Sequence, residues 1–168
     1  IRSDMERFSC ATYIANLTEE VATTGESNFP LFRLLLAGLS YFAFGEKDLA
    51  GRMLIYELKL MDLIGYRPVL GTCVICGNRP VGSAFSFRPE QGGLVCENCR
   101  GSDSSGIPIS RETSRMMQKI LDADIDECFR IFVLPGEKEQ MNRILPAYIE
   151  QKLEKKIKSR DFLKSFFI

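Results

Sequence analysis

Four cysteines constrain this chain more than any other feature. Cys73 and Cys76 form one Cys-x-x-Cys pair, Cys96 and Cys99 form another, and nineteen residues separate the pairs. The two-residue gap lets both thiolates of a pair reach one ion, and the intervening segment is long enough for a β-hairpin that returns the second pair to the first. Four thiolates complete a tetrahedral zinc sphere and leave no position for water or substrate. The sequence therefore predicts one structural Zn²⁺ on these four cysteines rather than a catalytic metal.

Two disulfides are the alternative use of the same cysteines. Disulfides need an oxidising compartment, and no signal peptide or apolar leader is visible, although the chain opens at Ile1 rather than at a methionine. The spacing favours zinc over disulfides. Cys10 and Cys128 lie outside the motif in apolar, helix-like contexts, so we expect them to be buried free thiols.

The composition narrows the class of protein. With 168 residues, 45% of them hydrophobic, the chain can bury one good core. Lysine plus arginine and aspartate plus glutamate both total 22, so no net field draws the chain to DNA. There is no histidine, which removes the usual general base and the Ser-His and Cys-His nucleophile pairs. We therefore expect a protein that is not an enzyme.

Hydrophobic periodicity predicts three consecutive helices, over residues 4–23, 30–44 and 47–64, with short connections. This is the pattern of a helical bundle. The second segment is apolar nearly all round, which predicts that it lies at the centre of the bundle. It is too short to span a membrane and contains Arg33, so no membrane association is expected.

A small β module follows. Strands are predicted over residues 84–87 and 93–95, then a helix from an N-cap at Ser110 to about Leu121 and a short helix or turn over 124–132. A last helix is expected over about 136–158, kinked or split by Pro146. The predicted fold is mainly α: a helical bundle with an inserted small β-hairpin four-cysteine zinc module. The corresponding division is 1–71 and 103–168 for the two helical parts and 72–102 for the module.

The charge of the module argues against direct DNA contact by it. Residues 72–102 sum to +1, and Zn²⁺ with four thiolates brings the module to −1, whereas a phosphate-tracking finger is cationic. The better cationic candidate for DNA is the C-terminal segment, where Lys152, Lys155 and Lys156 fall at i, i+3 and i+4. Lys158 and Arg160 extend this predicted DNA-binding set. An ordinary solvated helix face is the alternative.

Three short segments, in this order, resemble a known family. Tyr56-Glu57-Leu58 stands within an apolar helix, Gly65-Tyr66-Arg67-Pro68 closes that helix before Cys73, and Ile157-Lys158-Ser159-Arg160 is similar to a Leu-Lys-Ser-Arg signature. Together they resemble the C-terminal region of the RecO family of bacterial recombination mediators.

The resemblance implies an N-terminal OB-fold, a helical domain and often an inserted zinc module. It further implies binding of single- and double-stranded DNA, strand annealing, and cooperation with RecR and single-stranded-DNA-binding protein to load the RecA recombinase. No OB-fold precedes the helices in this sequence. We therefore expect a C-terminal portion whose DNA binding depends mainly on the missing domain, in the bacterial cytoplasm at the nucleoid.

The resemblance also suggests a partner site. The family's single-stranded-DNA-binding partner ends in an acidic tail with an apolar last residue, and such a ligand needs a cation beside an apolar groove. Arg52 and Lys59 are the candidate cations, with Phe42, Met53 and Tyr56 around them. A snorkelling arginine over core residues is the alternative.

Two other function classes compete with a non-enzymatic recombination mediator. GTPase-activating proteins of the Arf type carry a Cys-x-x-Cys module among helices and act through an arginine, but the nineteen-residue gap and the three preceding helices fit them poorly. A zinc-ribbon adaptor of transcription needs a strongly basic or aromatic-lined ribbon face, and residues 72–102 show none.

Overall fold

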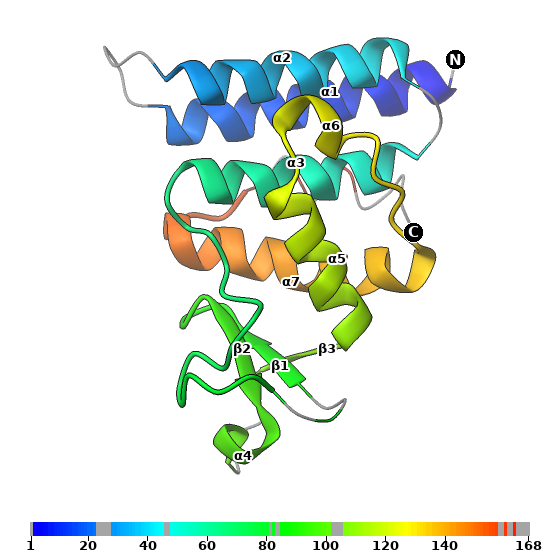
Figure 1. Cartoon of the computed structure of the whole chain (residues 1–168). Coiled ribbons are helices and arrows are strands. Elements are labelled where there is room, and N and C mark those ends of the chain that lie inside the picture. Colours follow the sequence, from blue (N-terminus) through cyan, green and yellow to red (C-terminus); the bar gives the residue numbers. More distant parts are fainter. Residues whose placement is uncertain are drawn as a thin grey trace.

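The computed structural model describes residues 2–22, 28–45, 48–80, 82, 85–101, 106–157, 160 and 163, with side chains from Met5 onward. Figure 1 shows mostly helices above a small sheet. The helices are α1 (Arg2–Val21), α2 (Phe29–Phe44), α3 (Leu49–Leu63), α4 (Glu97–Arg100), α5 (Arg111–Asp122), α6 (Ile125–Cys128) and α7 (Pro135–Leu153). The strands are β1 (Phe85–Arg88), β2 (Gly93–Cys96) and β3 (Ile107–Ile109).

The central element of the bundle is α3. It runs between the α1–α2 pair and α7, and α5 also packs on it. Every residue from Gly51 to Met61 is buried, including three charged side chains. The prediction that the second helix is central is therefore wrong. In α2 four large apolar side chains stay exposed, because only one face of that helix meets the core: Phe29, Phe32, Leu36 and Phe44.

Polar side chains begin the helices where the sequence supplies them. The Asn28 side chain accepts a hydrogen bond from the Leu31 amide at 3.0 Å, and the Ser110 hydroxyl accepts one from the Thr113 amide at 3.1 Å. Such caps satisfy amides that have no partner inside the helix. The predicted N-cap at Ser110 is confirmed.

The β module is a three-stranded antiparallel sheet in the order β2-β1-β3. Phe85 pairs with Cys96 on one side and with Ile109 on the other. The hairpin was predicted, but β3 was not, because a three-residue strand containing Pro108 carries almost no local signal. Phe87 makes an edge-to-face contact with Tyr148 of α7 at 5.3 Å between ring centroids, so the module shares one core with the helices.

The last predicted helix runs through Pro146 as one helix and is not split there, with buried residues on both sides of the proline. It also ends at Leu153 rather than near Lys158, because Glu154 takes a left-handed conformation with φ 51°. Among the described residues, no helix is long and apolar enough to cross a membrane. The mainly α fold with an inserted four-cysteine β-hairpin module is confirmed.

Candidate metal centre

The four motif cysteines converge at one end of the β module. Cys73 and Cys76 lie in a turn after α3, Cys96 ends β2 and Cys99 lies in α4. Their sulfur atoms all lie within 4.8 Å of one another, and those of Cys76 and Cys96 are 3.9 Å apart. A tetrahedral site with Zn–S bonds of about 2.3 Å separates its sulfurs by about 3.8 Å. The geometry therefore fits one tetrahedral ion held by four thiolates.

Backbone hydrogen bonds fix the first pair against the second. The Val74 amide donates to the Leu94 carbonyl of β2 at 2.8 Å, and the Cys96 amide donates to the Cys73 sulfur at 3.4 Å. The turn closes through Gly77, whose amide donates to the Cys73 carbonyl at 2.9 Å and whose φ of 72° suits glycine. The return of the second pair by a hairpin, expected from the spacing, is confirmed.

The pKa values of two of the motif thiols shift in opposite directions. Burial opposes ionisation of Cys73, but amide groups of Cys76, Cys96 and Ile75 lower its pKa to about 6. Hydrogen bonding to Cys96 and Cys76 raises the pKa of Cys99 to about 12. Sulfurs this close repel one another as thiolates unless a cation lies among them, and a bound dication removes that repulsion.

The remaining cysteines behave as ordinary core thiols. All six cysteines are free, and Cys10 and Cys128 are buried, as predicted. Burial raises the pKa of the Cys10 thiol to about 12 and that of Cys128 to about 11. Both thiols are therefore protonated at neutral pH and poor nucleophiles.

The predicted cationic surface is only partly formed. The Lys152 ammonium donates to the Glu90 carbonyl at 2.9 Å, and Lys155 pairs with Glu20 of α1. Because α7 ends at Leu153, Lys155 and Lys156 do not continue the helix face of Lys152. Lys158 lies outside the described residues.

Arg160 is not a surface residue, and its assignment to the cationic surface is corrected. It is 6% exposed, and its Nε donates to a carboxylate oxygen of Glu57 at 2.6 Å while another guanidinium nitrogen donates to the second oxygen at 3.0 Å. Burial lowers the pKa of Arg160, but the Glu57 carboxylate outweighs this and holds it above its usual value. The Tyr13 hydroxyl also donates to Glu57, at 2.6 Å. The guanidinium is thus occupied inside the core.

The predicted partner residues are also interior. Arg52, Lys59, Met53, Phe42 and Tyr56 are all buried, none of them more than 7% exposed. The Arg52 guanidinium lies 4.9 Å from the centre of the Tyr41 ring and donates to the Ile131 carbonyl. These side chains do not form the expected accessible cation beside an open groove, because α3 is enclosed by other helices.

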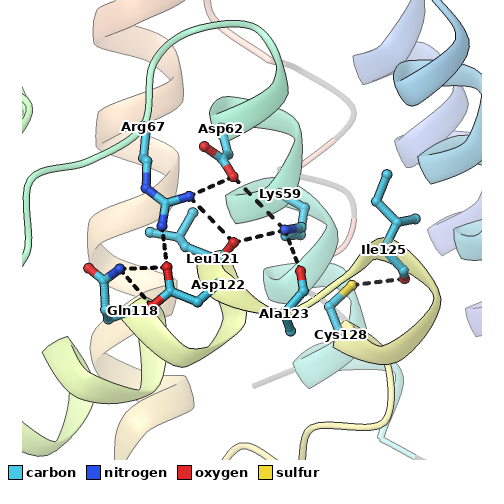
Figure 2. A network of polar contacts seen from close by, with 9 residues as sticks. All are labelled: Lys59, Asp62, Arg67, Gln118, Leu121, Asp122, Ala123, Ile125 and Cys128. Atoms are coloured by element: carbon cyan, nitrogen blue, oxygen red, sulfur yellow. Dashed lines mark hydrogen bonds and ion pairs between the residues drawn. The ribbon is translucent and has the colours of Figure 1, made fainter.

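Lys59 instead caps the C-terminal end of α5. Figure 2 shows its ammonium pointing at two backbone carbonyls, those of Leu121 at 3.0 Å and Ala123 at 2.8 Å. A cation at a helix C-terminus satisfies carbonyls that have no partner inside the helix and complements the helix dipole. Beside it, Arg67 bridges Asp62 of α3 and Asp122 of α5. The network therefore fixes α5 against α3.

Sequence reasoning missed a further group of arginines. Arg79, Arg111 and Arg115 line a groove between the β module and α5. The i, i+4 spacing of Arg111 and Arg115 on a predicted helix was an available signal. Their approach to Arg79 was not available, because it depends on how the module packs against α5.

Comparisons with known proteins identify the family of this chain. The chain matches the family described as Recombination protein O C terminal over residues 2–161. The DNA repair protein RecO of Alkaliphilus metalliredigens is 35% identical over 155 residues, which are 92% of this chain and 63% of the relative. The DNA repair proteins RecO of Desulforamulus reducens and Thermoanaerobacter sp. are 31% and 32% identical, over 97% of this chain and 63% and 65% of the relatives.

The chain thus spans less than two thirds of the length of these relatives. The family match covers nearly all of the chain, including the four cysteines, the central helix and Arg160. The chain belongs to the RecO family of DNA repair proteins, whose C-terminal region it matches.

Proposed function

We propose that this chain is the C-terminal part of a non-enzymatic recombination mediator that acts at the nucleoid in the bacterial cytoplasm. In this proposal it binds the acidic tail of single-stranded-DNA-binding protein and also RecR, and it assists DNA binding, strand annealing and RecA loading. The observation that carries the proposal is the family match over residues 2–161. The relatives named DNA repair protein RecO support a role in DNA repair.

Within that function, we assign a structural Zn²⁺ to Cys73, Cys76, Cys96 and Cys99. The donor set is four sulfurs within 4.8 Å of one another, which suits zinc and offers no open coordination position. Bound zinc would supply a crosslink and no reaction. It would hold the turn before Gly77 against β2 and so keep residues 72–102 as a unit on the helices.

Direct DNA contact is a secondary role in this proposal. The candidate cations that remain on the described surface are Lys152, Lys155 and Lys156, and Lys155 is already paired with Glu20. The whole chain has no net charge. A large positive field is what phosphate tracking requires, so protein partners are the main expected ligands of this part. A GTPase-activating function has no support from the family match.

Titration with a fluorescein-labelled peptide of the acidic tail tests the proposal. We expect saturable binding, followed by fluorescence anisotropy, that weakens as salt is raised from low to physiological ionic strength. A peptide in which each acidic residue is replaced by its amide is the matched control and should bind much more weakly. Absence of binding to the folded, metal-loaded chain would overturn the proposal that this part recognises the tail.

A further inference from the structure

The outer face of α2 is apolar along the length of the helix. Figure 1 shows α2 at the edge of the bundle, with α3, α7 and the β module on its other side. Four large side chains on this helix are more than half exposed: Phe29, Phe32, Leu36 and Phe44. A surface helix normally turns polar and charged side chains outward. This face therefore has the character of an interface, and we propose that it binds the same face of a second copy of this chain.

The charge of the face favours an apolar partner. Arg33 is the one charged residue in the sequence of α2, and it pairs with Asp126 of α6 in the same chain. A partner on this face therefore does not have to supply a countercharge. Nucleic acid and strongly acidic peptides bind through many cationic contacts, which α2 does not offer.

The exposed apolar area is as large as that of a protein interface. Arg7 of α1 donates to the Phe42 and Gly45 carbonyls, so the start of α1 lies beside the end of α2. There Met5 and Phe8 are also more than half exposed. At about 200 Å² for a fully exposed large side chain, these two residues and the four of α2 present roughly 700 Å². The largest apolar patch on a monomer usually measures about 300–600 Å², whereas a stable pair buries about 800 Å² per partner.

The order of side chains on the face identifies the occupant as a second copy. The exposed positions Phe29, Phe32, Leu36, Ser40 and Ala43 are spaced by 3, 4, 4 and 3 residues, which reads the same in both directions from Leu36. Two copies of α2 that pack antiparallel about a two-fold axis at Leu36 place Phe29 opposite Ala43 and Phe32 opposite Ser40. Each large ring then meets a small side chain, the pattern that lets two helix surfaces interdigitate. An unrelated partner imposes no such symmetry on the helix.

Sedimentation velocity of the metal-loaded chain over a range of concentrations tests the pair. We expect a reversible equilibrium with a dimer as the largest species, because a two-fold contact closes on itself. Leu36→Asp should raise the dissociation constant at least about 100-fold, since it places two unpaired carboxylates at the axis.

Ile75→Asp is the matched control for this substitution. Ile75 is an exposed apolar side chain of the β module, which Figure 1 shows at the opposite end of the molecule from α2. The control should leave the dissociation constant within about two-fold of the parent value. Circular dichroism checks that each variant is folded.

Disulfide trapping tests the two-fold register. A cysteine at position 36 lies on the axis and faces its own copy, so Leu36→Cys should give a crosslinked dimer under mild oxidation. Ser40→Cys is exposed on the same face, but its two copies lie about 12 Å apart along the antiparallel helices, beyond the reach of a disulfide. The parent chain, run alongside, reports any crosslinks through its own six cysteines.

The outcomes separate the pair from the proposed function. A chain that stays monomeric up to roughly 1 mM overturns the pair and leaves the face to another partner, such as the part of the relatives' length that this chain does not span. Equal crosslinking of the two cysteine variants, or aggregates that grow without limit, overturns the two-fold assignment. The tail peptide is titrated into the same samples. A monomer that binds the peptide removes the pair and leaves the proposed function intact, whereas a dimer that does not bind it removes only that function.

Discussion

At the level of single residues, the buried carboxylate of Glu57 depends on Arg160 for its charge partner. Glu57 is fully buried in α3 and receives hydrogen bonds from Tyr13, before it in the sequence, and from Arg160, far after it. A carboxylate in a protein interior is tolerated only when its charge is matched and its oxygens are bonded. The pair therefore holds Arg160 against the central helix.

Removal of Arg160 should destabilise the fold strongly. Arg160→Ala leaves the Glu57 charge buried without its cation, and we expect a loss of about 3 to 5 kcal/mol in the free energy of unfolding. Urea denaturation followed by circular dichroism measures it. The triple variant Tyr13→Phe, Glu57→Leu, Arg160→Met should recover most of the loss, since it also removes the Tyr13 hydroxyl that would lose its acceptor, and a buried pair can often be replaced by apolar side chains.

A surface pair gives the control for this effect. Arg143 lies 3.6 Å from Glu139 on the outside of α7, with both side chains more than half exposed. Arg143→Ala should change the free energy of unfolding by less than about 1 kcal/mol. A similar small change for Arg160→Ala would show that the buried pair contributes nothing special.

At the scale of elements, the position of α5 depends on its C-terminal contacts. Lys59→Met keeps an unbranched side chain of similar length but removes the donor to the Leu121 and Ala123 carbonyls. We expect a loss of about 1 to 3 kcal/mol, because these carbonyls lose a charged donor. Thermal melting measures the stability, and hydrogen exchange should show faster exchange of the α5 amides.

Lys119 provides the comparison on the same helix. It is exposed in the last turn of α5. Lys119→Met removes an equal charge near the same helix end, and it should change stability by less than about 0.5 kcal/mol. Equal effects of the two substitutions would mean that Lys59 acts through overall charge rather than as a cap.

At the scale of the whole molecule, the β module that carries the metal site shares one core with the helices, and Phe87 contacts Tyr148 there. We predict one zinc per chain by elemental analysis. Chelation or Cys96→Ser should lower the melting temperature and loosen residues 72–102 while much of the helical signal persists, because metal binding contributes directly to folding of the module.

Cys128 serves as the control for metal content. It is buried far along the sequence from the four-cysteine cluster. Cys128→Ala should retain one zinc per chain even where it lowers stability by leaving a small cavity. A chain that melts identically with and without zinc would rule out the structural role of the metal.

Features encoded by nearby residues were predictable. The Cys-x-x-Cys spacing, the hydrophobic repeat of the helices and the N-cap at Ser110 depend on neighbours within a few residues, and the structure has all three. The same kind of local pattern gave the wrong prediction for which helix lies at the centre of the bundle. The second helix is the more apolar by composition, yet α3 is the enclosed one, because enclosure depends on how many other helices pack around a segment.

Local patterns in the sequence were enough to predict the four-cysteine centre, the succession of helices and the resemblance that the family match confirmed. Only the folded chain shows that Arg160 pairs with Glu57, that Lys59 caps α5, and that Arg79, Arg111 and Arg115 line one groove. The difference lies in the sequence separation over which each interaction acts. Ligand spacing and helical periodicity act over a few residues, whereas the burial and pairing of a charge are set by segments that lie more than thirty residues apart and meet only in the folded chain.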